Sequence, residues 1–137
     1  MRLLWSKFLN YFYLVGQEWR STWVDIWNNP GGRWLTILDF LLLVISWVLA
    51  GWLVSATSKG LLILHYNIHF GIDLIGSPTS VYWLPAGATL AAVVNSFVLL
   101  FHYQLAKQLR VTILAGSLAV FALTDLALVS LLLINFR

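Results

Sequence analysis

Three long apolar runs constrain what this chain can fold into more than any other feature. Each run reaches or exceeds the roughly 20 apolar residues that a helix needs to cross a bilayer. They are Thr36–Ala56, Val81–Tyr103 and Val111–Ile134. Only 9% of the 137 residues are charged, against about 25% in a typical soluble domain. We therefore predict an all-α integral membrane protein with three transmembrane helices in one bundle, residues 30–137, with a loop at 57–80.

The basic residues predict the orientation of this bundle. If the chain alternates across the membrane, most Lys and Arg residues fall on one side: Arg2, Lys7, Arg20, Arg33, Lys107 and Arg110. Lys59 and Arg137 fall on the other side. Since basic residues accumulate on the cytoplasmic side, the N-terminus is expected in the cytoplasm, and the loop 57–80 and the C-terminus outside. We expect a multi-pass protein of a bacterial inner (plasma) membrane.

Residues 1–29 form a separate segment with helical periodicity. Large apolar side chains recur every three or four residues and make one stripe on a helix. The stripe consists of Trp5, Phe8, Phe12, Val15, Trp19, Trp23 and Ile26. Because Trp side chains favour the headgroup level, we predict an amphipathic helix that lies on the cytoplasmic membrane surface, anchored by Trp5, Phe8, Phe12, Trp19 and Trp23. Packing against a partner protein is the alternative. Pro30 and the glycines after it are expected to break the helix.

Small residues predict how the spans pack. Gly87, Ala91 and Asn95 share one face of the second span, and Gly116 belongs to a similar face of the third. Small residues let helices approach closely, and Asn95 can bond across the contact. The second and third spans are therefore expected to form a tight hairpin through a turn at 104–110.

Two acidic residues fall inside the spans. Asp125 lies near the middle of the third span, where a charge is costly, so we expect a protonated side chain bonded to Thr89 or to a backbone carbonyl. A proton or ion relay and a contact with a partner helix are the alternatives. Asp39 lies near the cytoplasmic end of the first span, within reach of Arg33 or the basic turn. For Asp39 we expect an ordinary interfacial ion pair.

The loop between the first two spans holds the candidate binding residues. They are His65, Asn67, Gly71, Asp73 and Gly76. Gly71 and Gly76 are expected to adopt positive φ, and His65 and Asn67 to bond the loop backbone or an outside ligand. On a helix, His65, His69 and Asp73 would have metal-ligand spacing. The glycines favour irregular or hairpin structure instead, so metal binding is only an alternative.

The loop text LHYNIHFGIDLIGSP, followed by VYWLPAGATLAAVV, carries a resemblance. It resembles the small membrane domain of unknown function at the front of bacterial sporulation-delay toxin immunity proteins. The matching residues are His65, Tyr66, Asn67, Gly71, Asp73, Gly76, Ser77, Leu84 and Pro85. Leu64 stands where the family has Pro, and Pro78 where it usually has Lys. The resemblance covers the first span, the loop and the second span, and the longer immunity module of that family has no counterpart here.

The sequence favours a non-enzymatic role. There is no cysteine, which excludes disulfides, thiolate metal sites and a Cys nucleophile. No catalytic constellation is evident, and we expect no cofactor and no nucleic-acid partner. We predict an accessory or assembly subunit, or a binding protein, of a bacterial inner-membrane complex, with the bilayer and either a membrane protein or copies of itself as partners. An immunity or sensor protein that recognises a peptide or envelope signal through His65–Ser77 is the alternative, and proton or ion transport through Asp125 in an oligomer comes third.

Overall fold

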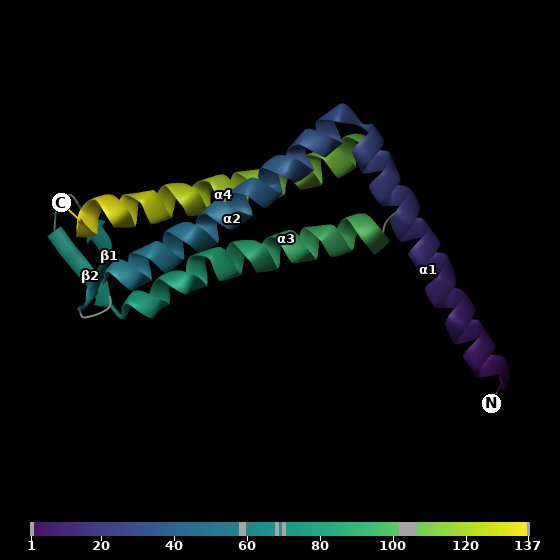
Figure 1. Cartoon of the computed structure of the whole chain (residues 1–137), viewed down its shortest axis with the longest axis horizontal. Coiled ribbons are helices and arrows are strands. Elements are labelled where there is room, and N and C mark those ends of the chain that lie inside the picture. Colours follow the sequence, from purple (N-terminus) through teal and green to yellow (C-terminus); the bar gives the residue numbers. More distant parts are fainter. Residues whose placement is uncertain (1, 58–59, 68, 70, 102–106, 137) are drawn as a thin grey trace.

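A computed structural model describes residues 2–57, 60–67, 69, 71–101 and 107–136 (Figure 1). Within these ranges the chain forms four α-helices, one two-stranded hairpin and a short 3-10 helix. In chain order the elements are α1 (Arg2–Asn28), α2 (Pro30–Ala56), β1 (Leu62–Asn67), β2 (Gly71–Gly76), η1 (Pro78–Tyr82), α3 (Trp83–Phe101) and α4 (Lys107–Asn135). The N-terminus and the C-terminus lie at opposite ends of the molecule.

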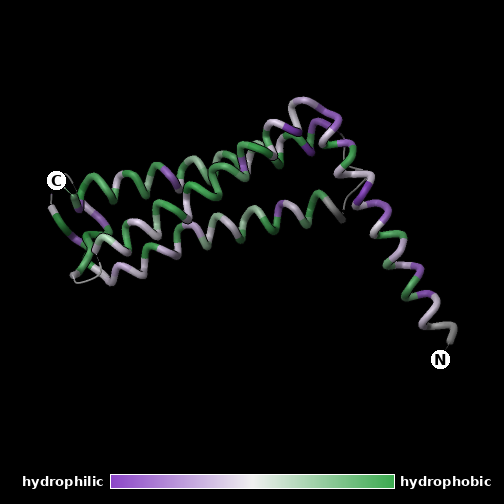
Figure 2. The backbone as a smooth tube through the Cα atoms, viewed as in Figure 1, coloured by the Kyte–Doolittle hydropathy of each residue, from purple (hydrophilic) through white to green (hydrophobic). Residues whose placement is uncertain are grey.

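Three of the helical segments are long and apolar enough to cross a membrane. They are Pro30–Ala56, Pro78–Leu99 and Lys107–Asn135, which confirms the three predicted spans. In Figure 2 the apolar colouring dominates these helices, whereas α1 mixes polar and apolar residues. The chain therefore has the make-up of a multi-pass membrane protein.

The pairing of the three helices differs from the prediction. α2 and α4 run in the same direction and share the most extensive contact, and α3 runs antiparallel to both (Figure 1). α3 does contact α4, but less extensively. The predicted turn at 104–110 extends too far, because α4 already begins at Lys107. Residues 104–106 lie outside the described part.

A sharp joint connects α1 to α2. Pro30 occupies the first turn of α2, where the missing N–H costs nothing, so it ends one helix and begins the next. A Cβ at Gly32 would lie 2.8 Å from the Ile26 carbonyl oxygen, so glycine permits the close approach. From this joint α1 turns away from the bundle, and its first turns contact no other element (Figure 1).

The loop predicted as irregular or hairpin structure is an antiparallel hairpin, so the all-α prediction was incomplete. β-branched and aromatic residues favour these strands, and Gly71 adopts a φ of 78° at the turn, as predicted. The same prediction for Gly76 was wrong, since Gly71 has the only positive φ among the described residues. Gly76 instead leaves room for Leu64, whose Cδ1 would lie 2.5 Å from an added Cβ.

The best-packed core lies where the hairpin meets the bundle. Its fully buried side chains come from α2, β1, η1 and α4. They are Ala50, Leu53, Leu62, Val81 and Leu128, with Leu131 beside them. The hairpin is therefore part of the folded core rather than a loop on its surface.

Candidate functional site

The hairpin is attached to the bundle by a side-chain amide that the sequence analysis did not single out. The Oδ1 atom of Asn135 accepts a hydrogen bond from the Ile63 N–H at 2.9 Å, and its Nδ2 donates to the Ile63 carbonyl at 3.0 Å. Nδ2 also donates to the Leu131 carbonyl of its own helix at 2.9 Å. The Asn135 amide thus makes with Ile63 the two hydrogen bonds that a neighbouring strand would make with this residue of β1. The sequence offered one indication of this contact, because Asn135 is a polar amide at the end of an otherwise apolar span.

The solvent-facing side of the hairpin carries a His–Asp pair. The Nδ1 atom of His65 on β1 lies 2.6 Å from Oδ1 of Asp73 on β2, and both side chains are exposed, at 61% and 42%. His65 therefore bonds a side chain rather than the backbone group that was expected. The side chain of Asn67 lies outside the described part. The contact with Asp73 holds one ring nitrogen of an imidazole that is 61% exposed.

The metal alternative is not supported. In the described residues no three His, Asp, Glu or Cys side chains come close enough to hold a metal ion. The spacing of His65, His69 and Asp73 fits a metal only on a helix, and here the residues belong to two strands and their turn. The hairpin brings His65 and Asp73 together without completing a ligand set.

The hairpin end also exposes apolar side chains. Tyr66 follows His65 on β1, Ile72 and Leu74 flank Asp73 on β2, and all three are about half exposed. Trp83, at the start of α3, is 80% exposed. This end of the molecule thus displays both a polar pair and exposed apolar side chains, a composition common in protein-binding surfaces.

Asp125 is bonded, but not to the predicted partner. Its Oδ1 accepts a hydrogen bond from the Ser46 hydroxyl of α2 at 2.5 Å, while its Oδ2 is buried and has no partner among the described residues. The predicted partner, Thr89, donates to the Pro85 carbonyl and accepts from the Trp47 indole. The prediction failed because α2, not α3, lies against this part of α4. Ser46 and Asp125 both fall near the middle of their spans. Their similar depth in the membrane could therefore have pointed to Ser46 as the partner.

The small-residue faces are only partly used in contacts between spans. Asn95 donates to the Ser117 hydroxyl at 2.8 Å, so the predicted bond across the contact of the second and third spans is present. Ala91 is half-buried. Gly87 and Gly116 are exposed, with no atom within 4 Å of an added Cβ, so they do not lie at the α3–α4 contact.

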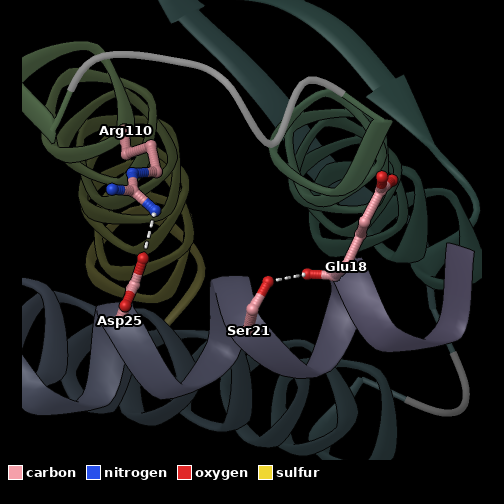
Figure 3. A network of polar contacts seen from close by, with 4 residues as sticks. All are labelled: Glu18, Ser21, Asp25 and Arg110. Atoms are coloured by element: carbon pink, nitrogen blue, oxygen red, sulfur yellow. Dashed lines mark hydrogen bonds and ion pairs between the residues drawn. The ribbon is translucent and has the colours of Figure 1, made fainter. Parts of the chain in front are cut away.

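An ion pair joins α1 to α4 near the joint. Arg110 lies 3.4 Å from Asp25, and Figure 3 shows the two side chains pointing toward one another from separate helices. On α1 itself, the Ser21 hydroxyl donates to the Glu18 carbonyl. The ion pair predicted between Asp39 and Arg33 or the basic turn is wrong, because no ion pair of Asp39 occurs among the described residues and Arg110 pairs with Asp25 instead. Oδ1 of Asp39 is buried, and no partner for it occurs in the described residues.

The aromatic stripe of α1 is uncovered. Its five predicted anchors, Trp5, Phe8, Phe12, Trp19 and Trp23, are between 37% and 63% exposed. By contrast, Thr22 and Ile26 near the end of α1 are buried against the bundle. The helix is thus held at one end and leaves its apolar stripe available to another surface.

Comparison of the chain with protein-family models, with curated proteins and with solved structures found no significant match. The resemblance to the toxin-immunity membrane domain consequently stays a prediction.

Proposed function

We propose that this chain is a non-enzymatic accessory or binding subunit of a bacterial inner-membrane complex that presents its hairpin to a protein partner. The observation that carries the proposal is the fixed hairpin. Asn135 and the buried Leu62 hold β1 on the bundle, while His65, Asp73 and Ile72 face outward. A recognition surface benefits from such an arrangement, because a rigid surface loses little conformational entropy on binding.

The proposed placement puts the hairpin outside and α1 at the cytoplasmic surface. α1 leaves the bundle at the end opposite the hairpin (Figure 1). If the bundle axis is perpendicular to the membrane, α1 therefore runs near the headgroup level. Its exposed Trp and Phe side chains suit that level. The basic residues of α1 and of the start of α4 agree with a cytoplasmic side.

Placement can be tested with single cysteines, since the chain has none. Thr79 near the hairpin and Gln17 on α1 are both exposed. In intact bacterial cells a membrane-impermeant maleimide should label Thr79→Cys and not Gln17→Cys. After the membrane is permeabilised, both should react. Labelling of Gln17→Cys alone in intact cells would reverse the orientation and refute the proposed outer hairpin.

Partner recognition can be tested by photo-crosslinking in native membranes. A benzophenone amino acid at Ile72, exposed on β2, should form a covalent adduct with one protein. The same group at Leu123, exposed on α4, serves as the lipid-facing control. His65→Ala should reduce the Ile72 adduct without lowering thermal stability in detergent. Equal labelling at both positions, or no protein adduct at Ile72, would contradict the proposal.

The second candidate is a sensor or immunity protein that uses the same surface. The exposed His65–Asp73 pair favours it, because a surface with both a polar pair and exposed apolar side chains suits an extended peptide. The crosslinking experiment separates the two. An accessory subunit should give its adduct in untreated membranes, whereas a sensor should give one only when an extracytoplasmic peptide is supplied.

A further inference from the structure

A cavity of about 180 Å³ lies inside the bundle near the α1 end, between all four α-helices. Most of its wall is apolar, including Phe40 of α2 and Phe121 of α4. Asp39 also lines it, and one carboxylate oxygen of Asp39 is buried without a partner among the described residues. A buried carboxylate oxygen without a hydrogen bond is costly, so a donor at Oδ1 would stabilise this half-buried side chain.

The other polar groups of the cavity do not bond this oxygen. The hydroxyls of Thr36, Ser96 and Ser117 each donate to a carbonyl of their own helix. The Asn95 amide donates one hydrogen bond to Ser117. The wall also holds the Thr22 hydroxyl and the Trp23 indole, yet among the described residues no donor reaches Oδ1 of Asp39. Asp39 is the one acidic group of the described lining.

No Lys or Arg of the described residues lines this cavity. Arg110 pairs with Asp25, and the Arg33 guanidinium lies 6.0 Å from the centre of the Trp34 ring. Lys107 lines a neighbouring cavity of about 320 Å³ at the joint, not the one at Asp39. No ion pair reaches Asp39 in the part of the chain described. The cavity thus has room for a cation supplied by another molecule.

We infer that this cavity binds the protonated amine of an amphiphilic organic molecule. The ammonium donates to Asp39, and the apolar part of the ligand lies against Phe40 and Phe121. Mostly apolar walls with one placed polar group are typical of small-molecule sites, and aromatic rings also attract cations. The same ammonium chemistry occurs in free amphiphilic amines and in the ethanolamine headgroup of phospholipids. This site is separate from the hairpin surface.

Phenethylamine is a suitable probe, and phenethyl alcohol is its uncharged match in size. The full chain is reconstituted in nanodiscs of phosphatidylcholine, which has no protonated amine. Binding is measured by equilibrium dialysis of radiolabelled phenethylamine, with empty nanodiscs to subtract partition into lipid. We expect saturable binding of one molecule per chain, without competition by the alcohol.

Variants of the two intramembrane acids locate the bound amine. Asp39→Asn should weaken phenethylamine binding roughly 10- to 100-fold, the loss of one charge-assisted hydrogen bond. Asp125→Asn removes the other carboxylate and should leave the affinity unchanged. Asp39→Glu keeps the charge and should retain saturable binding, so a folding defect in Asp39→Asn does not decide the question. Partial replacement of phosphatidylcholine by phosphatidylethanolamine should lower phenethylamine binding if the lipid headgroup is the source, and leave it unchanged if a free amine is.

Four results would overturn the inference. Equal competition by phenethyl alcohol, or unchanged binding in Asp39→Asn, would show that the cavity holds apolar groups without using the acid. Absence of saturable binding would show that there is no amine site. Loss of a co-purifying membrane protein in Asp39→Asn, with no amine binding to the wild-type chain, would assign the carboxylate to a cationic residue of a partner helix.

Discussion

The hairpin end and the α1 end of the same bundle are packed in different ways. At the hairpin end, Leu53, Leu62 and Leu128 are completely buried, and Asn135 satisfies both backbone groups of Ile63. At the α1 end the helices enclose two cavities, and one acid is left with an unpartnered buried oxygen. Both ends thus hold a polar side chain inside the structure, Asn135 at the hairpin end and Asp39 at the α1 end. They differ in that Asn135 has hydrogen-bond partners within reach and Oδ1 of Asp39 has none among the described residues.

The comparison indicates a division of roles along the bundle. Close packing and satisfied backbone groups hold the hairpin as a rigid surface. Open space and unused acceptors at the α1 end leave room for a ligand. Four experiments, taken from the largest expected effect to the smallest, test how firmly the hairpin end, the middle of the bundle and the α1 end are held.

Leu53→Ala should have the largest effect, because Leu53 is 0% exposed at the centre of the hairpin-end core. Removing a buried Leu costs about 2–5 kcal/mol in soluble proteins. Lipid supplies little hydrophobic driving force, so we expect the lower part of that range, about 2 kcal/mol. Leu99→Ala, which adds to the cavity near α1, should cost less. Unfolding free energies from SDS titration measure both, and a larger loss at Leu99 would reverse the comparison.

Asn135→Ala should loosen the hairpin. It leaves the N–H and carbonyl of Ile63 without their partner. Because Ile63 is only half-buried, water can replace part of these bonds, and we expect a loss of about 1 kcal/mol, at the low end for an unsatisfied group. Hydrogen exchange at the Ile63 amide should accelerate, while exchange at the centre of α4 should stay slow. Ser130→Ala is the control, since that exposed hydroxyl bonds only its own helix. Unchanged exchange at Ile63 would show that buried contacts alone fix the hairpin.

Ser46→Ala and Asp125→Leu should each lose the bond that joins the middle of α2 to α4. Such bonds average about 0.6 kcal/mol inside membranes and reach about 1.7. A double-mutant cycle of the two should give a coupling energy in that range. Asp125→Asn should fold nearly normally, because its amide can still accept from Ser46. Strong destabilisation by Asn would instead show that the charge itself is used.

Arg110→Gln should have the smallest effect on stability. Its partner Asp25 is largely exposed, and exposed ion pairs contribute about 0–1 kcal/mol. The residual effect should fall further as salt is raised, because exposed charges are screened. A loss as large as that of Leu53→Ala would show that the α1 joint is as firmly held as the hairpin end.

Local features of the sequence determined the elements. Apolar length predicted three spans, and periodicity predicted α1, since both properties depend on residues that are neighbours along the chain. The Pro30 break and the glycine turn at Gly71 were equally local. Even the bond of Asn95 could be anticipated, because its face of the helix was evident from spacing.

Tertiary structure decided which elements meet. Ser46 and Asp125 are 79 residues apart, Asn135 and Ile63 are 72 apart, and Asp25 and Arg110 are 85 apart. Spacing along a helix specifies a face but not the neighbour of that face, so we expected Thr89 or a backbone carbonyl for Asp125, and Arg33 or the basic turn for Asp39. The closer contact of α2 with α4 gave Asp125 its Ser46 partner, and the α1 joint drew Arg110 to Asp25. Asp39 was left facing a cavity because no Lys or Arg of the described residues lines it.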